Sequence, residues 1–244
     1  MNRTVLITGG SRGIGRATAE LFAEQGDKVM INYLHSESQA VTLYKSLREK
    51  GYMAEIYAAD IAVESDVKEL FSYTNEVFGN VDILINNAGI AQQKLFCDIT
   101  EDEWHRMFDV NITGTFHCCK NALPSMINKK RGKIINVSSI WGISGASCEV
   151  HYSASKAAII GLTRALAKEV GPSNIQVNCV APGIISTEMN AFLSNDDIES
   201  LCCETPLGRF GKPIDIANSI LFLASEKADF ITGQVLSPNG GFVI

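Results

Sequence analysis

The strongest constraint on the fold of this chain is a regular alternation of short β-branched runs with longer stretches of helical periodicity. Runs such as VLIT and IINV are continuously apolar, which is typical of parallel strands covered on both faces. The alternation predicts one α/β domain, a doubly wound Rossmann-type fold with a parallel seven-stranded sheet and helices on both faces. The expected strands are Thr4–Thr8, Lys28–Tyr33, Ala54–Ala58, Asp82–Asn86, Lys133–Ser138, Gln176–Val180 and Gln234–Leu236.

The stretches between these runs have the apolar spacing of amphipathic helices. Glycines follow several predicted helix ends, where we expect left-handed C-terminal caps: Gly26, Gly51, Gly79, Gly132 and Gly171. The expected helices are Ile14–Gln25, Ser38–Lys50, Glu64–Phe78, Trp104–Asn128, Ser153–Val170 and Pro213–Ser225.

The alternation breaks once, between Gly183 and Gly211. A segment of this length inside a compact domain is usually a binding loop, so we expect 184–210 to be a substrate-binding loop or lid within a single domain, 1–244. A surface excursion with short helices is the alternative. The apolar residues of the segment are Met189, Phe192, Leu193, Leu201 and Leu207.

Composition excludes several classes of protein. The 244 residues are 46% hydrophobic and carry a net charge of −6, which suits a globular chain and argues against nucleic acid as the main partner. No apolar run approaches the roughly 20 residues that span a bilayer, and the opening MNRTVLITGG lacks a secretion signal, so we expect no membrane partner and a cytoplasmic location. Seven cysteines without C-x-x-C or zinc spacing indicate reduced thiols and no metal site.

A glycine-rich turn, TGGSRGIG, joins the first expected strand to the first helix. A pyrophosphate can bind at a helix N-terminus because unpaired N–H groups and the positive end of the helix dipole meet it there. Glycine at positions 9, 13 and 15 lets the backbone approach such a ligand. The context of strand, turn and helix predicts dinucleotide binding, although a tight turn without a ligand would look similar.

The end of the second strand indicates which dinucleotide binds. NAD-binding versions usually place a carboxylate there for the ribose hydroxyls, but Asn32-Tyr33-Leu34-His35-Ser36 contains none before Glu37. Arg12 in the glycine turn can offer a cation to a 2′-phosphate. We therefore expect NADP(H) rather than NAD(H); a solvated surface charge is the other interpretation of Arg12.

Tyr152 and Lys156 are four residues apart at the start of an expected helix, so they lie on one face. A tyrosine hydroxyl has an ordinary pKa near 10 and is a poor acid–base group at neutral pH. A neighbouring ammonium favours the phenolate and lowers that pKa, which would make Tyr152 a usable proton donor and acceptor.

Together with other motifs, this pair resembles the short-chain dehydrogenase/reductase family over essentially the whole chain. Ser139 precedes Tyr152 by 13 residues, the spacing usual in that family. The matching motifs are T-G-x-x-x-G-I-G at Thr8–Gly15, Asn86-Asn87-Ala88-Gly89, Asn111, Ser139, Tyr152-x-x-x-Lys156, Pro182-Gly183, Thr187 and Asn239-Gly240-Gly241.

The resemblance implies a catalytic set of Asn111, Ser139, Tyr152 and Lys156. In it Tyr152 protonates a ketone, Lys156 lowers the tyrosine pKa and bonds the nicotinamide ribose, Ser139 holds the carbonyl oxygen and Asn111 orders a water. Strand alternation lets only one of Ser138 and Ser139 point into the site, and the spacing favours Ser139. The implied cofactor-binding residues are Gly9, Ser11, Arg12, Gly13, Ile14, Gly15, Asn32, Tyr33, Asp60, Ile61, Asn87, Ala88, Gly89, Tyr152, Lys156, Pro182, Gly183, Ile185 and Thr187.

Within the family the chain is similar to 3-oxoacyl-(acyl carrier protein) reductases, through Ala181–Gly183, Pro206–Arg209 and Thr232–Leu236. This implies a ketone substrate carried by acyl carrier protein, for which Lys129–Arg131 is a candidate basic contact, although helix-end charges explain that run equally well.

The run 138–150 is similar to reductases of a 5-aminopentanone group on a modified lysine of elongation factor P. Glu149 could pair with the ammonium of such a substrate, or simply be a helix N-terminal charge. A dinucleotide-binding regulator without turnover is the alternative from a different class.

Family members of this type are mostly homotetramers. The resemblance implies one interface on the helices 104–128 and 153–170, and a second on the last strand and the helix from Pro213. Apolar residues suited to the second interface, which core packing would also explain, are Phe222, Leu223, Phe230 and Phe242.

Overall fold

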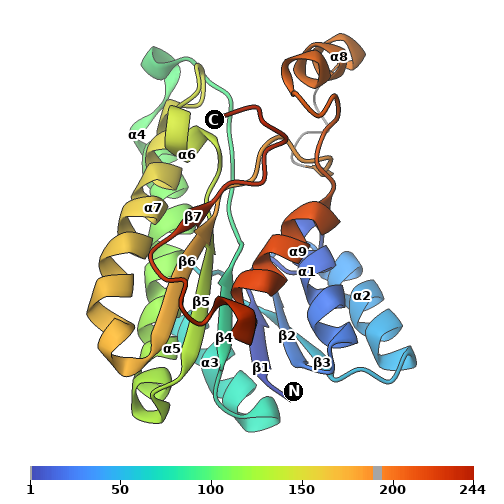
Figure 1. Cartoon of the computed structure of the whole chain (residues 1–244), viewed down its shortest axis with the longest axis vertical. Coiled ribbons are helices and arrows are strands. Elements are labelled where there is room, and N and C mark those ends of the chain that lie inside the picture. The colour runs from blue at the N-terminus through green and yellow to red at the C-terminus, as the bar shows by residue number, and fades with distance from the viewer. Residues whose placement is uncertain (1, 189–193) are drawn as a thin grey trace.

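Seven parallel strands form one sheet, as predicted, in the order β3-β2-β1-β4-β5-β6-β7. Figure 1 shows the computed structural model, which describes residues 2–188 and 194–244. The order reverses between β1 and β4, so the topological switch point, where open α/β sheets bind ligands, lies beyond the carboxyl ends of these two strands. The strands are β1 Thr4–Ile7, β2 Lys28–Tyr33, β3 Ala54–Ala58, β4 Ile83–Asn86, β5 Gly132–Val137, β6 Ile175–Val180 and β7 Val235–Leu236.

Helices cover both faces of the sheet, with α1, α2 and α9 on one side and α3, α5 and α7 on the other (Figure 1). The helices are α1 Gly13–Glu24, α2 Glu37–Glu49, α3 Glu64–Phe78, α4 Glu101–Phe108, α5 Gly114–Lys129, α6 Trp141–Ser144, α7 Val150–Val170, α8 Asn195–Glu204 and α9 Pro213–Leu223. No helix in the described part of the chain combines the length and apolar character needed to cross a membrane.

Strand alternation explains the two layers of core. Val5 and Ile7 pack with the α1, α2 and α9 face, whereas Leu6 between them packs with the α3, α5 and α7 face. All three side chains are 0% exposed. Because successive strand residues point to opposite faces, a continuously apolar strand requires cover on both sides.

The predicted helix Trp104–Asn128 is not one α-helix. A π-helix at Asp109–Thr113 separates α4 from α5. Asn111 lies in this wider turn, where its side chain exchanges hydrogen bonds with the backbone of Ile90. The apolar spacing predicted one continuous helix over this range. It carried no signal for the π-helix, whose turn holds more residues than an α-helical turn.

The predicted positive φ is found at Gly26, Gly51 and Gly79, at +79°, +81° and +86°. Gly79 nevertheless differs from a left-handed cap, because its ψ is −177°. The prediction is wrong for Gly132, which begins β5, and for Gly171, which has φ of −54°. Lys130 and Asn174 adopt the left-handed conformation at those two helix ends. A Cβ on Gly132 would lie 2.5 Å from Met126 Cγ, so close packing explains that glycine.

The segment 184–210 contains the short helix α8, a feature that only the alternative interpretation of this segment expected. Ser194 and Asp197 form a capping box at its start. Ile185 forms a parallel bridge with Gly211, so the two ends of the segment lie side by side. Met189, Phe192 and Leu193 lie outside the described residues.

Candidate active site

The glycine-rich turn after β1 is held against the segment that follows β4. The Asn87 amide donates to the carbonyls of Thr8 and Gly9, both at 3.0 Å. Gly9 has φ of +60°, and a Cβ there would lie 2.9 Å from Ala88 Cα. A Cβ on Gly15 would lie 2.4 Å from the Gly9 carbonyl oxygen. Glycine is therefore required here by the packing of the turn, whatever ligand it holds.

A cavity of about 550 Å³ opens at the carboxyl ends of the strands, beside this turn. Every residue expected to bind the cofactor lines it except Gly15, which packs behind Gly9. Of the expected catalytic residues, Ser139, Tyr152 and Lys156 line the cavity and Asn111 does not. The structure thus brings together the residues that the motifs singled out, from the carboxyl ends of β1 to β6 and from the start of α7.

The residues present fit a nicotinamide dinucleotide. Arg12 is the N-cap residue of α1, and its side chain makes no capping hydrogen bond with the described residues. The helix begins directly after the glycine-rich turn, which lines the cavity. Gly9 and Gly13 both have positive φ, which a side chain would strain. A helix N-terminus behind a glycine cradle suits a pyrophosphate.

The part of the cavity at the end of β2 carries exposed Arg12 and no carboxylate from that strand end. His35 and Ser36 also line it, and the sequence analysis missed both as contacts. Their place directly after β2 is the signal that could have found them, because the 2′ position is recognised there. Asn32 is only 2% exposed, and its amide donates to Ala59 at 3.0 Å, which joins β2 to the end of β3.

Asp60 forms an ion pair with Arg106 of α4, with 3.2 Å between Oδ2 and Nη2. Both residues line the cavity beside Ile61. Arg106 had no sequence signal, because its partner lies 46 residues away. The ion pair of Asp60 and Arg106 therefore forms part of the cavity wall next to the expected adenine site.

The two neighbouring serines after β5 have different partners. Ser138 Oγ donates to the backbone carbonyl of Lys156 at 2.7 Å. Ser139 Oγ accepts from the Trp141 N–H at 3.2 Å, and its hydroxyl acts to lower the pKa of Tyr152. Of the two serines, Ser139 is therefore the one that acts on Tyr152.

Burial dominates the electrostatics of Tyr152 and Lys156. It raises the pKa of Tyr152 to about 12, with the hydrogen bond from Ser139 acting in the opposite direction. It lowers the pKa of Lys156 to about 8. Lys156 Nζ lies 5.7 Å from the centroid of the Tyr152 ring and donates to Val137 O at 3.0 Å. The expected lowering of the tyrosine pKa by Lys156 is therefore not observed in this structure, where desolvation of the phenolate raises that pKa.

The side chain of Asn111 connects the loop after β4 to helix α7. Its Oδ1 accepts from Ile90 N at 2.9 Å, and its Nδ2 donates to Ile90 O at 3.0 Å and to Ser155 Oγ at 2.9 Å. A Cβ on Gly89 would lie 3.1 Å from Asn111 Oδ1 and 3.2 Å from Lys156 Nζ. Asn111 and Lys156 therefore converge on the backbone at Gly89.

Several polar side chains line the cavity near Tyr152. Gln92, Gln93, Trp141 and Glu149 line it beside Tyr152. Glu149 is partly buried, which raises the pKa of its carboxyl, and Gln93 Nε2 donates to it at 3.4 Å. The sequence motifs did not predict that Gln92 and Gln93 line the cavity. Their position in the loop after the Asn-Ala-Gly motif is the sequence signal that could have indicated it.

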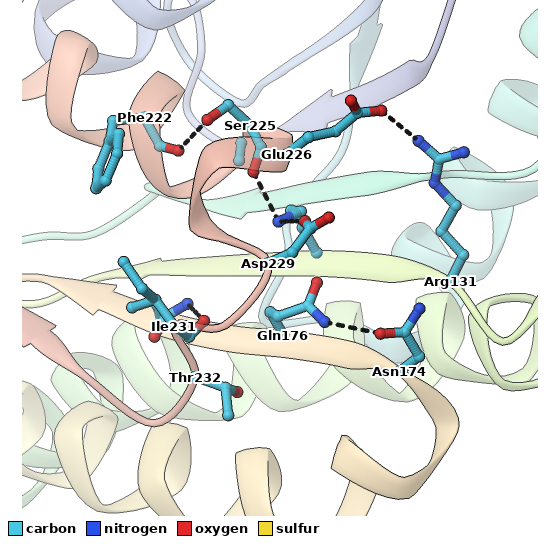
Figure 2. A network of polar contacts seen from close by, with 12 residues as sticks. Arg131, Asn174, Gln176, Phe222, Ser225, Glu226, Asp229, Ile231 and Thr232 are labelled. Atoms are coloured by element: carbon cyan, nitrogen blue, oxygen red, sulfur yellow. Dashed lines mark hydrogen bonds and ion pairs between the residues drawn. The ribbon is translucent and has the colours of Figure 1, made fainter.

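The candidate basic contact at 129–131 lies at the opposite edge of the sheet, just before β5 begins. Lys129 pairs with Asp82 at 3.0 Å and Arg131 with Glu226 at 3.6 Å. Figure 2 shows Arg131 beside Glu226, in a polar network that also includes Asp229. Two of these three cations are therefore bound to carboxylates of their own chain.

All seven cysteines are free thiols in the structure. Within residues 2–188 and 194–244, no group of three or more histidine, cysteine or acidic side chains is placed to hold a metal ion.

Comparisons with known proteins relate the chain to reductases and a dehydrogenase. Residues 9–243 match a family model described as enoyl-(acyl carrier protein) reductase. The chain is 42% identical over 241 residues to the 3-oxoacyl-(acyl-carrier-protein) reductase FabG of Staphylococcus epidermidis, covering 99% of both chains. It is 41% identical over 236 residues to FabG of Aquifex aeolicus, covering 97% of this chain and 95% of that one.

A crystal structure of an Agrobacterium tumefaciens protein, described as a "putative gluconate dehydrogenase", superposes with a TM-score of 0.95 at 34% identity. The match covers 99% of this chain and 97% of the other.

Proposed function

The chain belongs to the short-chain dehydrogenase/reductase family of oxidoreductases, and from that premise we propose that it is an NADPH-dependent reductase of 3-oxoacyl groups carried by acyl carrier protein. The observation that carries the proposal is the meeting of Ser139, Tyr152 and Lys156 with the glycine turn around one cavity, in a chain about two-fifths identical to 3-oxoacyl reductases. The product would be a secondary alcohol.

The reacting groups have distinct parts to play. When bound, the reduced nicotinamide supplies hydride to the carbonyl carbon. Tyr152 donates its phenolic proton to the ketone oxygen, which Ser139 holds by a hydrogen bond. Lys156 places an ammonium beside the phenol, and Asn111 holds the backbone at Ile90 and the helix at Ser155. The cavity residues named above would hold the cofactor.

NADPH is favoured over NADH by charge. Arg12 is exposed at the cavity wall, and His35 and Ser36 offer further donors there. No carboxylate at the end of β2 opposes a phosphate. A guanidinium binds a phosphate through strong, charge-assisted hydrogen bonds, whereas it gains little from a ribose hydroxyl.

Segment 184–210 is proposed as the substrate-binding loop. Ile184, Thr187 and Glu188 line the cavity at its start. The bridge between Ile185 and Gly211 anchors the segment at the cavity mouth. This placement suits a loop that shapes the substrate end of the site.

A second candidate substrate is the 5-aminopentanone group of a modified lysine on elongation factor P. The observation that favours it is the Glu149 carboxylate at the substrate end of the cavity, beside Tyr152. An acyl thioester gives a carboxylate nothing to bind, whereas an ammonium would compensate its burial.

We propose that the protein works in the cytoplasm as a homotetramer. Seven free thiols suit a reducing compartment. Phe222 is 43% exposed and Phe230 fully exposed, so both are available to the interface expected at β7 and α9, and Figure 2 shows the Phe222 ring pointing away from its neighbours there. Leu223 instead belongs to the core, and Phe242 packs on Trp141 with 5.8 Å between ring centroids. Light scattering after gel filtration would give the mass.

The decisive experiment measures loss of NADPH absorbance with an acetoacetyl thioester beside 5-amino-2-pentanone. Turnover of the thioester that disappears in Tyr152→Phe supports the carrier-bound 3-oxoacyl substrate. Preference for the amino-ketone moves the enzyme to the elongation factor. Absence of NADPH oxidation with every ketone tried would contradict both and favour a dinucleotide-binding regulator.

A further inference from the structure

A chain of polar side chains connects the surface of α4 to the residue that precedes Tyr152. Lys94 Nζ donates to both carboxylate oxygens of Glu103, at 2.8 and 2.7 Å. Gln92 Nε2 donates to Glu103 Oε1 at 2.7 Å, and Gln92 Oε1 lies 2.9 Å from His151 Nε2. The four residues come from the loop after β4, from α4 and from the first turn of α7.

The hydrogen bonds along these four residues have only one consistent direction. The bonds that Glu103 accepts, the one from Lys94 above all, hold the pKa of its carboxyl at about 2, so this carboxylate is ionised and can only accept. It therefore fixes which end of the Gln92 amide is nitrogen, and leaves the amide oxygen facing His151. An amide oxygen also only accepts, so His151 must carry its proton on Nε2.

His151 is 0% exposed, and burial holds its pKa below the ordinary value, which favours the neutral ring at neutral pH. Its other nitrogen, Nδ1, is a buried acceptor without a hydrogen-bond partner among the described residues. The ring consequently has one polar anchor, the Gln92 amide. A buried imidazole with a single anchor depends on that bond for its orientation.

The loop that carries Gln92 also forms a wall of the reaction site. Gln92 itself lines the cavity. Two residues earlier, the backbone of Ile90 both donates to and accepts from the Asn111 side chain. Two residues later, the Lys94 N–H donates to Cys148 O at 2.7 Å. The loop is therefore held on both sides of Gln92, which fixes the place of the Gln92 side chain at the cavity wall.

The Lys94 contact with Cys148 joins this loop to the segment that leads into α7. The loop and the start of α7 are thus joined three times: through this backbone hydrogen bond, through the Gln92 and His151 side chains, and through the Gln93 and Glu149 side chains. Any shift of Gln92 would be transmitted to His151 and to the adjacent Tyr152.

We propose that Gln92 is a positioning residue for Tyr152: held by Glu103, it anchors His151 as the Nε2–H tautomer and so sets the first turn of α7 against the cavity wall. The proposal rests on the proposed function, in which Tyr152 is the proton donor. Gln92 itself exchanges no proton with substrate, and Glu103 acts only through Gln92.

The first test observes the tautomer and needs no turnover. Long-range proton–nitrogen spectra of the four histidines, with His151 assigned as the signal missing from His151→Phe, should show the Nε2–H form in the parent protein. Glu103→Gln keeps Gln92 but frees its amide to turn, so a mixture of tautomers is expected. A parent His151 in the Nδ1–H form would overturn the proposal.

The second test measures turnover. Gln92→Leu should lower kcat about tenfold with the dissociation constant of NADPH unchanged, because only the alignment of Tyr152 is lost. Glu103→Gln should also lower kcat, and it provides the same test if Gln92→Leu does not fold. Gln39→Leu, on the exposed face of α2, is the matched control. Unchanged kcat in both variants would overturn the positioning role, whereas activity surviving in Tyr152→Phe would overturn the proposed function and leave the tautomer result standing.

Discussion

Ser138 and Lys156 are joined by a 2.7 Å hydrogen bond from the serine hydroxyl to the lysine carbonyl, which ties the end of β5 to helix α7. Ser139, the next residue, instead acts to lower the pKa of Tyr152. The two adjacent serines therefore differ in their surroundings, one tied to the backbone of α7 and the other beside the proposed proton donor.

This division predicts opposite effects of two alanine substitutions. Ser138→Ala should lower the free energy of unfolding by about 1 kcal/mol, because it removes a buried hydrogen bond, and should leave most of kcat. Ser139→Ala should lower kcat about 100-fold with little change in stability, because it removes a donor to the developing oxyanion. Urea denaturation and steady-state kinetics on both variants would separate the roles; a larger loss of kcat in Ser138→Ala would contradict the assignment.

The buried ammonium of Lys156 predicts a pH-dependent stability. Burial lowers its pKa from 10.5 to about 8, so between these values the unfolded chain binds a proton that the folded chain does not. The free energy of unfolding should therefore rise with pH over that window, by on the order of 3 kcal/mol relative to Lys156→Met. Urea titrations of both proteins at several pH values would measure it, and Lys45→Met on the exposed face of α2 controls for the loss of a charge. A difference that is constant with pH would count against the buried ammonium.

Arg12 should decide between the two nicotinamide cofactors. Arg12→Met should lower kcat/KM for NADPH by roughly 10- to 100-fold and leave that for NADH nearly unchanged, because only the 2′-phosphate loses a charge-assisted partner. The ratio of the two kcat/KM values is the measurement. Arg16→Met provides the matched control, since Arg16 lies one turn further along α1 and is paired with Glu20. Equal losses with both cofactors would mean that Arg12 does not recognise the 2′-phosphate.

Glu149 should affect charged and neutral ketones differently. Glu149→Gln keeps the size and the contact with Gln93 but removes the charge, so kcat/KM for an amino-ketone should fall about tenfold while that for a neutral acetoacetyl thioester stays the same. Parallel kinetics with the two substrates would show this. A parallel decline on both substrates would instead indicate a general role at the start of α7.

The layered fold was predictable because its signals are local. The apolar strands and the glycine turn each lie within a few consecutive residues, and the parallel pairing of β1 with β4 follows from the βαβ units that such segments build. Tyr152 and Lys156 were recognisable for the same reason, since four residues within one helix place them on one face.

The remaining features depend on contacts between distant segments. The π-turn at Asn111 bonds Ile90, 21 residues away, and Gln92 bonds His151 across 59 residues. Periodicity within a window carries no information about such pairs. Local signals were enough to predict the strands, most of the helices and the candidate residues Ser139, Tyr152 and Lys156. They could not predict the separate partner of Ser138, the effect of burial on the pKa of Tyr152 or the loop that contacts α7, because these depend on packing between elements far apart in the chain.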